Sequence, residues 1–248
     1  MTAISEHVLN FMPGAGTVLQ VGPLALLYAT VTALLCGHLR VHRHVRAPYT
    51  RKVFHFAIFT MATAVHFVWA LPGVVVFGAT TSLVVLAVVA RGSGFPAYEA
   101  LARPTDAPHR TMFILIPLAT TAAGGVLSNL LFPAYAYIGY LITGWGDAVG
   151  EPVGTRWGRH RYRVPSLSGV PATRSLEGST AVFLVGAVAA VLGLAIAGVS
   201  AGAALVIGCG AGLAGALVEA FSNHGTDNLT VQLAGAGAAW LIAMRVLG

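Results

Sequence analysis

Apolar stretches long enough to cross a membrane recur along the chain, separated by short polar segments. A membrane-spanning helix needs about 20 largely apolar residues. The pattern predicts eight such helices, with seven as an open alternative because Gly144, Trp145 and Gly146 weaken the end of the fifth. The predicted spans are 18–38, 53–70, 72–90, 112–132, 133–150, 179–198, 200–221 and 229–247. We therefore expect an all-α, polytopic integral membrane protein that forms one transmembrane domain over residues 1–248.

The basic residues give these helices an orientation. Thirteen of the fourteen Lys and Arg residues lie in the loops 39–52, 91–111 and 151–178, each of which follows an odd-numbered span. Because basic loops stay in the cytoplasm, we expect these loops there, the N-terminus outside, and the protein in the plasma (inner) membrane. The first twenty residues contain no Lys or Arg, so we expect no signal peptide, with the first span leading insertion.

The composition agrees with a membrane protein. Hydrophobic residues make up 56% of the chain and charged residues 9%, whereas a soluble domain carries about 25% charged residues. This composition excludes nearly every class of water-soluble globular protein. It also argues against a nucleic-acid partner despite the net charge of +6, because topology alone accounts for the excess of basic residues.

The acidic residues are few, and most of them gather near one membrane face. Of eight Asp and Glu residues, five fall at the predicted cytoplasmic ends of spans five to eight. A charged side chain within the membrane costs about 2.5–3.5 kcal/mol, which makes each of the five a candidate for function. They are Asp147, Glu151, Glu177, Glu219 and Asp227.

The segment from Gly146 to Gly154 carries two of these acids. Asp147 and Glu151 are four residues apart, so on a helix they share one face. Two such carboxylates can hold Mg²⁺, which completes its shell with water and substrate phosphates. Pro152 predicts that the helix kinks or ends near Glu151. The alternative is an ordinary polar helix end, with glycines that serve packing.

The start of the sixth span offers a site for phosphate. Free backbone N–H groups and the helix dipole favour anions at such a position, and small residues flank Glu177 there. Glu177 is either a helix-start acid without a further role or a contact to a metal or nucleotide. Basic residues nearby can also bind phosphate, although topology alone explains most of them. The candidates in this region are Ser175, Gly178, Ser179, Arg156, Arg159, Arg161, Arg163 and Arg174.

Two further segments add candidates at the same face. The polar hinge around Glu219 and Asp227 separates the last two apolar spans, and it includes His224 and Asn228, the latter as a possible helix N-cap. Lys52 and His55 lie at the cytoplasmic start of span two, one turn apart. Lys52 is first of all a topology determinant, and His55 can face the same site.

Together these segments resemble the CTP-dependent lipid kinases, a family that includes dolichol, phytol and farnesol kinases and a CTP-using diacylglycerol kinase. The resemblance is strongest over 144–180, where Gly-Asp, the spaced glycines, the basic stretch and Ser-Leu-Glu-Gly-Ser follow in family order. It extends to Glu219 and to 225–228, and more weakly to the Arg-Lys-x-x-His of 51–55. Two positions depart from the family: Arg174 replaces a common Lys, and Gln232 stands where Pro often occurs.

The resemblance implies transfer of the γ-phosphate of CTP to the hydroxyl of an isoprenoid alcohol (phytol, polyprenol or dolichol) or of diacylglycerol, with Mg²⁺ or a similar divalent cation. The segments 144–180 and 219–228 would then be catalytic. Asp147 with Glu151 or Glu177 would hold the metal, and Glu219 or Asp227 would orient the lipid hydroxyl. The nucleotide would be bound by the arginines and small residues named above, together with Lys52, His55 and Asn228.

Two other functions stay open from the sequence. A phosphatidate cytidylyltransferase (CDP-diacylglycerol synthase) is also polytopic and uses CTP and Mg²⁺, but the chain lacks that enzyme's C-terminal signature of paired Gly before Asp-Arg. A membrane transporter is the second alternative, although transporters often contain internal repeats and none is visible here. The sequence leaves the acceptor lipid and the oligomeric state open.

Overall fold

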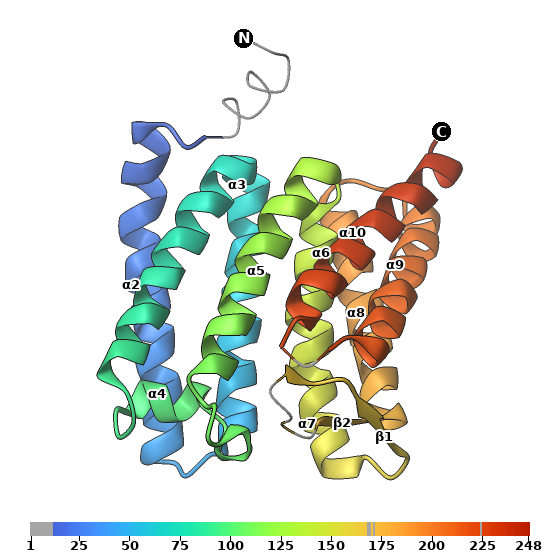
Figure 1. The fold of residues 1–248 in the computed structure, drawn as a ribbon. Coiled ribbons are helices and arrows are strands. Elements are labelled where there is room, and N and C mark those ends of the chain that lie inside the picture. The colour runs from blue at the N-terminus through green and yellow to red at the C-terminus, as the bar shows by residue number, and fades with distance from the viewer. Residues whose placement is uncertain (1–11, 168–169, 171, 224) are drawn as a thin grey trace.

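The described chain folds into long, roughly parallel helices with one small β-hairpin at the end opposite the start of the first long helix and the C-terminus (Figure 1). The computed structural model describes residues 12–167, 170, 172–223 and 225–248. The long elements are α2 (Ala15–Val41), α3 (Ala47–Arg91), α5 (Met112–Leu131), α8 (Leu176–Ile196), α9 (Ala201–Phe221) and α10 (Asp227–Val246). The short ones are α4 (Pro96–Leu101), η1 (Pro104–Asp106), α6 (Ala136–Leu141), η2 (Ile142–Asp147), α7 (Ala148–Trp157), β1 (Arg161–Val164) and β2 (Ala172–Ser175).

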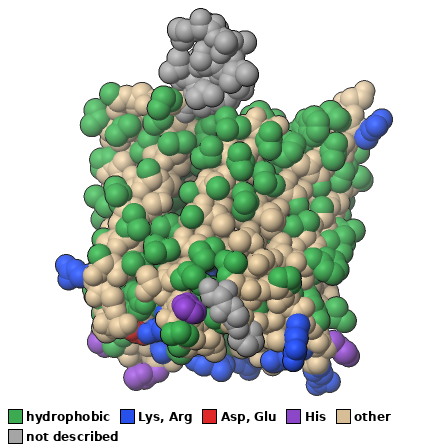
Figure 2. All heavy atoms as spheres, viewed as in Figure 1, with side chains coloured by type: hydrophobic (Ala, Val, Ile, Leu, Met, Phe, Trp, Pro, Cys, Tyr) green, Lys and Arg blue, Asp and Glu red, His purple; other side chains and the backbone are tan. Residues whose placement is uncertain are grey.

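Within the described ranges, six helices are long and apolar enough to cross a membrane, which confirms the expectation of an all-α, multi-pass membrane protein. Figure 2 shows apolar side chains over most of the surface and Lys, Arg and His mostly at one end, the end that carries the hairpin. The number of spans, seven or eight, stays a prediction.

The second and third predicted spans form one element, the 45-residue helix α3. The helix is interrupted at Ala70, whose φ of 47° and ψ of −146° are not helical. Pro72, two residues later, lacks the N–H that would continue the helical hydrogen bonds. From this interruption the chain turns back, so the two halves of α3 form a V (Figure 1), and residues of both halves line the same cavity.

The fifth predicted span, 133–150, differs from the expectation in its geometry. It consists of α6, the π-helical segment η2 and then α7, which continues past Pro152 to Trp157. Of the two predicted outcomes, a kink or an end near Glu151, the end is therefore wrong, because α7 continues through Pro152. Such π-helical segments are frequent at functional sites, and η2 ends at Asp147.

The spaced glycines of α7 allow it to approach α8 closely. A Cβ atom on Gly150 would lie 3.2 Å from the carbonyl oxygen of Gly178, and one on Gly178 would lie 2.9 Å from that of Gly150. Helices in membranes use small residues for such close packing. At these positions the packing interpretation of the glycines is therefore correct, and it brings the start of α8 next to Asp147 and Glu151.

The basic segment after α7 forms the hairpin that the sequence pattern did not predict. β1 and β2 are antiparallel, with Tyr162 opposite Arg174. β2 leads directly into α8, where the Ser175 hydroxyl caps the helix by accepting a hydrogen bond from the Gly178 N–H at 3.1 Å. The hairpin thus carries Arg161 and Arg174 to the N-terminus of α8.

Candidate active site

A polar cavity of about 350 Å³ opens at the basic end of the molecule. Its walls come from α3, η1, α7, the hairpin, α8, α9 and α10, which are far apart in the sequence. Ten of the residues predicted from the sequence line it: Lys52, Asp147, Glu151, Arg161, Arg174, Ser175, Gly178, Ser179, Glu219 and Asp227.

The first charged cluster in this cavity centres on Lys52, which is only 6% exposed. Its Nζ atom lies 2.6 Å from Oδ2 of Asp147 and 3.2 Å from Oε2 of Glu151. His55 lies one turn along α3, with Nε2 3.5 Å from the same Asp147 oxygen and 3.1 Å from the Thr143 carbonyl oxygen. Lys52 is therefore the buried counter-charge of the Asp147–Glu151 pair rather than only a topology signal.

The sequence pattern missed Arg103, which completes this cluster. Its guanidinium donates to Oε1 of Glu151 at 3.0 Å and binds both oxygens of Asp106 at 3.0 Å. Burial lowers the pKa of Arg103, but the carboxylates of Glu151 and Asp106 raise it more, so the pKa lies above its ordinary value. Since Arg103 and Glu151 lie on separate segments, 48 residues apart, no spacing rule could have joined them.

The second charged cluster centres on Arg174 of β2. Its Nε lies 2.8 Å from Oε1 of Glu219, its Nη2 lies 2.9 Å from Oδ2 of Asp227, and its Nη1 donates to the Ser222 carbonyl oxygen at 3.1 Å. One guanidinium thereby holds α9, α10 and the hairpin together. The forked geometry of Arg suits these three contacts better than the single ammonium of Lys would.

One buried carboxylate oxygen in the cavity differs from the others in its hydrogen bonding. Glu219 is buried, and within the described part of the chain its Oε2 atom has no hydrogen-bond partner. A buried acceptor without a partner is costly. Among the described residues no three His, Cys, Asp or Glu side chains lie close enough together to form a metal site, so the protein by itself supplies at most two such ligands at one point.

Several predicted residues lie outside this cavity. Glu177 is at the start of α8 but binds His160, with Oε1 2.8 Å from Nδ1, so the structure does not bring it to Asp147. Three predicted phosphate ligands, Arg156, Arg159 and Arg163, are exposed and away from the cavity lining. Asn228 is not the N-cap of α10, because the helix begins at Asp227 and Thr226 precedes it as the cap. His224 falls outside the described residues.

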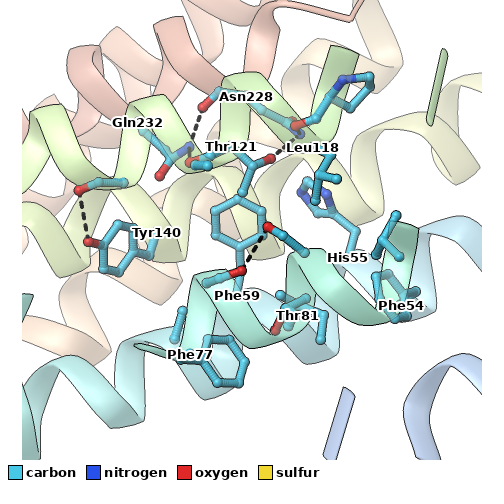
Figure 3. A pocket seen from close by; sticks show the side chains of 18 of the residues that line it. Phe54, His55, Phe59, Phe77, Thr81, Leu118, Thr121, Tyr140, Asn228 and Gln232 are labelled. Carbon is cyan, nitrogen blue, oxygen red and sulfur yellow. Dashed lines mark hydrogen bonds between the residues drawn. The ribbon is translucent and has the colours of Figure 1, made fainter. Parts of the chain in front are cut away.

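A second cavity, of about 340 Å³, adjoins the first and is mainly apolar (Figure 3). Both halves of α3, together with α5, α6 and α10, form its walls. Arg51 lines both cavities. His55 and Asn228 line the apolar one, next to Asp147 and Asp227 of the polar one. The hydrophobic pattern could not reveal this cavity, because its lining residues look like ordinary span residues.

The chain is similar to a phytol kinase from Synechocystis sp., with 33% identity over 153 residues. The match covers 62% of this chain and 61% of the relative's length. It confirms the resemblance to lipid kinases that the motifs indicate. No family model and no solved structure matches the chain.

Proposed function

We propose that the protein is a CTP-dependent kinase that phosphorylates the hydroxyl group of an isoprenoid alcohol. The observation that carries the proposal is that a charged cavity and an apolar cavity meet at Arg51, which lines both, with His55 of the apolar cavity 3.5 Å from Asp147 of the charged one. The charged cavity suits the phosphates of a nucleoside triphosphate, and the apolar cavity suits a lipid chain. The hydroxyl of the lipid alcohol must then reach the boundary between the two cavities. The similarity to a phytol kinase supports an isoprenoid alcohol as the acceptor.

The cationic side chains of the polar cavity would bind the phosphates. Arg51, Arg161 and Arg174 line it, and guanidinium groups form strong, forked hydrogen bonds with phosphate. The N-terminus of α8, beside Ser179, adds the positive end of the helix dipole, which favours an anion. Because basic residues surround this end of the molecule, we place the site on the cytoplasmic side of the plasma membrane.

A divalent cation such as Mg²⁺ fits the carboxylates present. Mg²⁺ is usually held by one or two protein carboxylates together with substrate phosphates, and the unpaired Glu219 Oε2 is a suitable ligand in a cavity that Asp147 also lines. These two residues would hold the ion, and Glu151 stands beside Asp147 as a further acid. When bound, the ion neutralises charge on the transferring phosphate.

Phosphoryl transfer asks little covalent chemistry of a protein beyond placing the reactants in line. The acceptor hydroxyl would enter from the apolar side and meet His55, whose Nε2 lies 3.5 Å from Asp147. His55 and Asp147 are thus the pair placed to orient the hydroxyl. Lys52 would keep Asp147 ionised and fixed in position. This assignment replaces the expectation that Glu219 or Asp227 orients the hydroxyl, because both face Arg174 instead.

The test is incubation of the purified protein with γ-labelled CTP and a panel of phytol, farnesol, dolichol, undecaprenol and diacylglycerol. We expect label on an isoprenoid alcohol and release of CDP. Release of pyrophosphate with transfer of CMP would instead establish a cytidylyltransferase. Solute flux into vesicles without nucleotide, and no labelled lipid, would establish a transporter.

A further inference from the structure

We propose that the apolar cavity is a groove, open sideways to the membrane between α3 and α5, that binds the single hydrocarbon chain of the lipid alcohol. The inference rests on the proposed function for the identity of the head group. It adds where the acceptor lies, how it enters, and why a one-chain lipid fits.

The lining of the cavity divides into an inner wall and an outer rim. Phe77, Phe113 and Tyr140 form a fully buried inner wall, whereas Ala79 and Ala122 on the outer rim are exposed. The rim lies where the second half of α3 faces α5, and α5 packs mainly against α10 and only sparsely against α3. Since this surface of the molecule faces hydrocarbon, the groove opens to the lipid tails rather than to water.

The size of the groove favours one chain. Its volume of about 340 Å³ lies near the lower end of the roughly 300–1,000 Å³ range of small-molecule pockets. Its wall follows α3 from Phe54 to Ala62, a rise of about 12 Å at 1.5 Å per residue. A short isoprenoid chain fills this space, and a longer chain continues out through the rim into the bilayer. Two acyl chains side by side exceed it.

A buried polar atom within the groove points to an alcohol rather than to a plain hydrocarbon. Gln232 lines the groove and is completely buried, and among the described residues its Oε1 atom has no hydrogen-bond partner. An unpaired acceptor in an apolar site is costly. An alcohol hydroxyl is a donor that can satisfy it on the way to His55, whereas a hydrocarbon chain without a hydroxyl cannot.

Two glycines allow a matched test of the groove. A Cβ atom on Gly78, which lines the groove, would meet nothing within 4 Å, and the same holds for Gly202, which lies outside it on α9. Gly78→Phe therefore fills the groove without a clash at its Cβ, and Gly202→Phe adds the same side chain elsewhere. Ala122→Phe, on the opposite rim, provides a second variant if Gly78→Phe proves unstable in thermal unfolding.

The first readout is photocrosslinking of the detergent-solubilised protein, without nucleotide, to a phytol analogue with a diazirine on its chain. We expect crosslinks in α3 and α5. We expect their yield to fall at least about tenfold in Gly78→Phe, the scale on which a pocket rejects a chain that no longer fits. Gly202→Phe should match the wild type. Crosslinks that lie elsewhere, or that persist in both groove variants, would overturn the inference.

The second readout separates this inference from the proposed function. Gly78→Phe should raise KM for phytol and leave phosphorylation of the shorter alcohol geraniol within about twofold of the wild type, because the head of the groove is unchanged. Crosslinking in the groove without phosphate transfer to any alcohol would refute the kinase and leave the groove standing. Equal phosphorylation of phytol by the wild type and both groove variants would refute the groove and leave the kinase standing.

Discussion

The polar and apolar cavities have nearly the same volume, about 350 and 340 Å³. They differ in how far their lining side chains already bind one another. In the polar cavity most carboxylates already have a cationic partner within the chain, as in the Lys52–Asp147 and Arg174–Glu219 pairs. The apolar cavity has few polar atoms, so a hydrocarbon chain that enters it breaks few existing contacts. One cavity must therefore exchange partners to bind its ligand, and the other must only be filled.

This difference explains why both can exist in one membrane protein. A buried charge is tolerated when an opposite charge compensates it, and it becomes strongly destabilising when that partner is lost. Substrate phosphates would compete with carboxylates for Arg174, so binding in the polar cavity rearranges existing ion pairs. Binding in the apolar cavity depends on shape and buried area. Mutations should therefore act differently in the two regions.

The largest effect is expected from Asp147→Asn, which keeps the shape of the side chain and removes its charge. We expect kcat to fall by about 10²–10³-fold, the cost of losing one electrostatic group at the reacting centre. The measurement is transfer of label from γ-labelled CTP to phytol. Glu99→Gln is the matched control, because Glu99 pairs with Arg110 outside both cavities. Near-normal activity of Asp147→Asn would remove this residue from the mechanism.

Lys52→Met should mainly affect stability. It leaves the buried carboxylates of Asp147 and Glu151 without their shared ammonium, a loss expected to cost about 3 kcal/mol. Thermal unfolding in detergent measures it. The double variant Lys52→Met with Asp147→Asn should recover part of the loss, because it removes one uncompensated charge. If the double variant is no more stable than the single one, the ion pair is not the reason for the effect.

Arg174 offers a test that compares charge with shape. Arg174→Met should raise KM for CTP about tenfold or more, since a charge-assisted contact to phosphate is lost. Arg174→Lys should lie between it and the wild type, because Lys keeps the charge but not the three contacts to Glu219, Asp227 and Ser222. Arg163→Met is the control at an exposed arginine of the same hairpin. Equal effects at both arginines would mean that general positive charge, and not this geometry, binds the nucleotide.

The sequence predicted the charged half of this comparison much better than the apolar half. Asp147, Glu151, Glu219 and Asp227 were recognisable because acids are rare in membrane helices and therefore informative. Their partners were harder to find. Arg103 lies in a basic loop, where topology already explains a positive charge, and its contact with Glu151 depends on how distant segments pack.

The helices themselves were predictable from hydropathy, whereas the local departures from regular structure were not. The length and order of apolar segments indicate α2, α5, α8, α9 and α10 to within a few residues. The hairpin has only four residues per strand, and it depends on contacts with α8. The apolar groove arises from the space between helices, which is a tertiary property that no single segment encodes.

The smallest effect is expected at Glu177, where the motif and the geometry make different predictions. The motif resemblance makes it a metal or nucleotide ligand, in which case Glu177→Ala would lower kcat about as strongly as Asp147→Asn. Its position outside the cavity gives it instead a positioning role. Its carboxylate accepts hydrogen bonds from the His160 backbone N–H and lies 2.8 Å from the ring nitrogen Nδ1, at the start of the hairpin that carries Arg161 and Arg174.

We therefore expect Glu177→Ala to raise KM for CTP by about threefold, within the modest range of exposed ion pairs, with kcat nearly unchanged. Glu177→Gln should restore wild-type KM, since the amide oxygen still accepts from the His160 backbone. A metal ligand would behave differently, because loss of its charge in Glu177→Gln would lower kcat strongly. Steady-state kinetics of the two variants thus decide whether Glu177 only positions the hairpin or acts as a ligand in the active site.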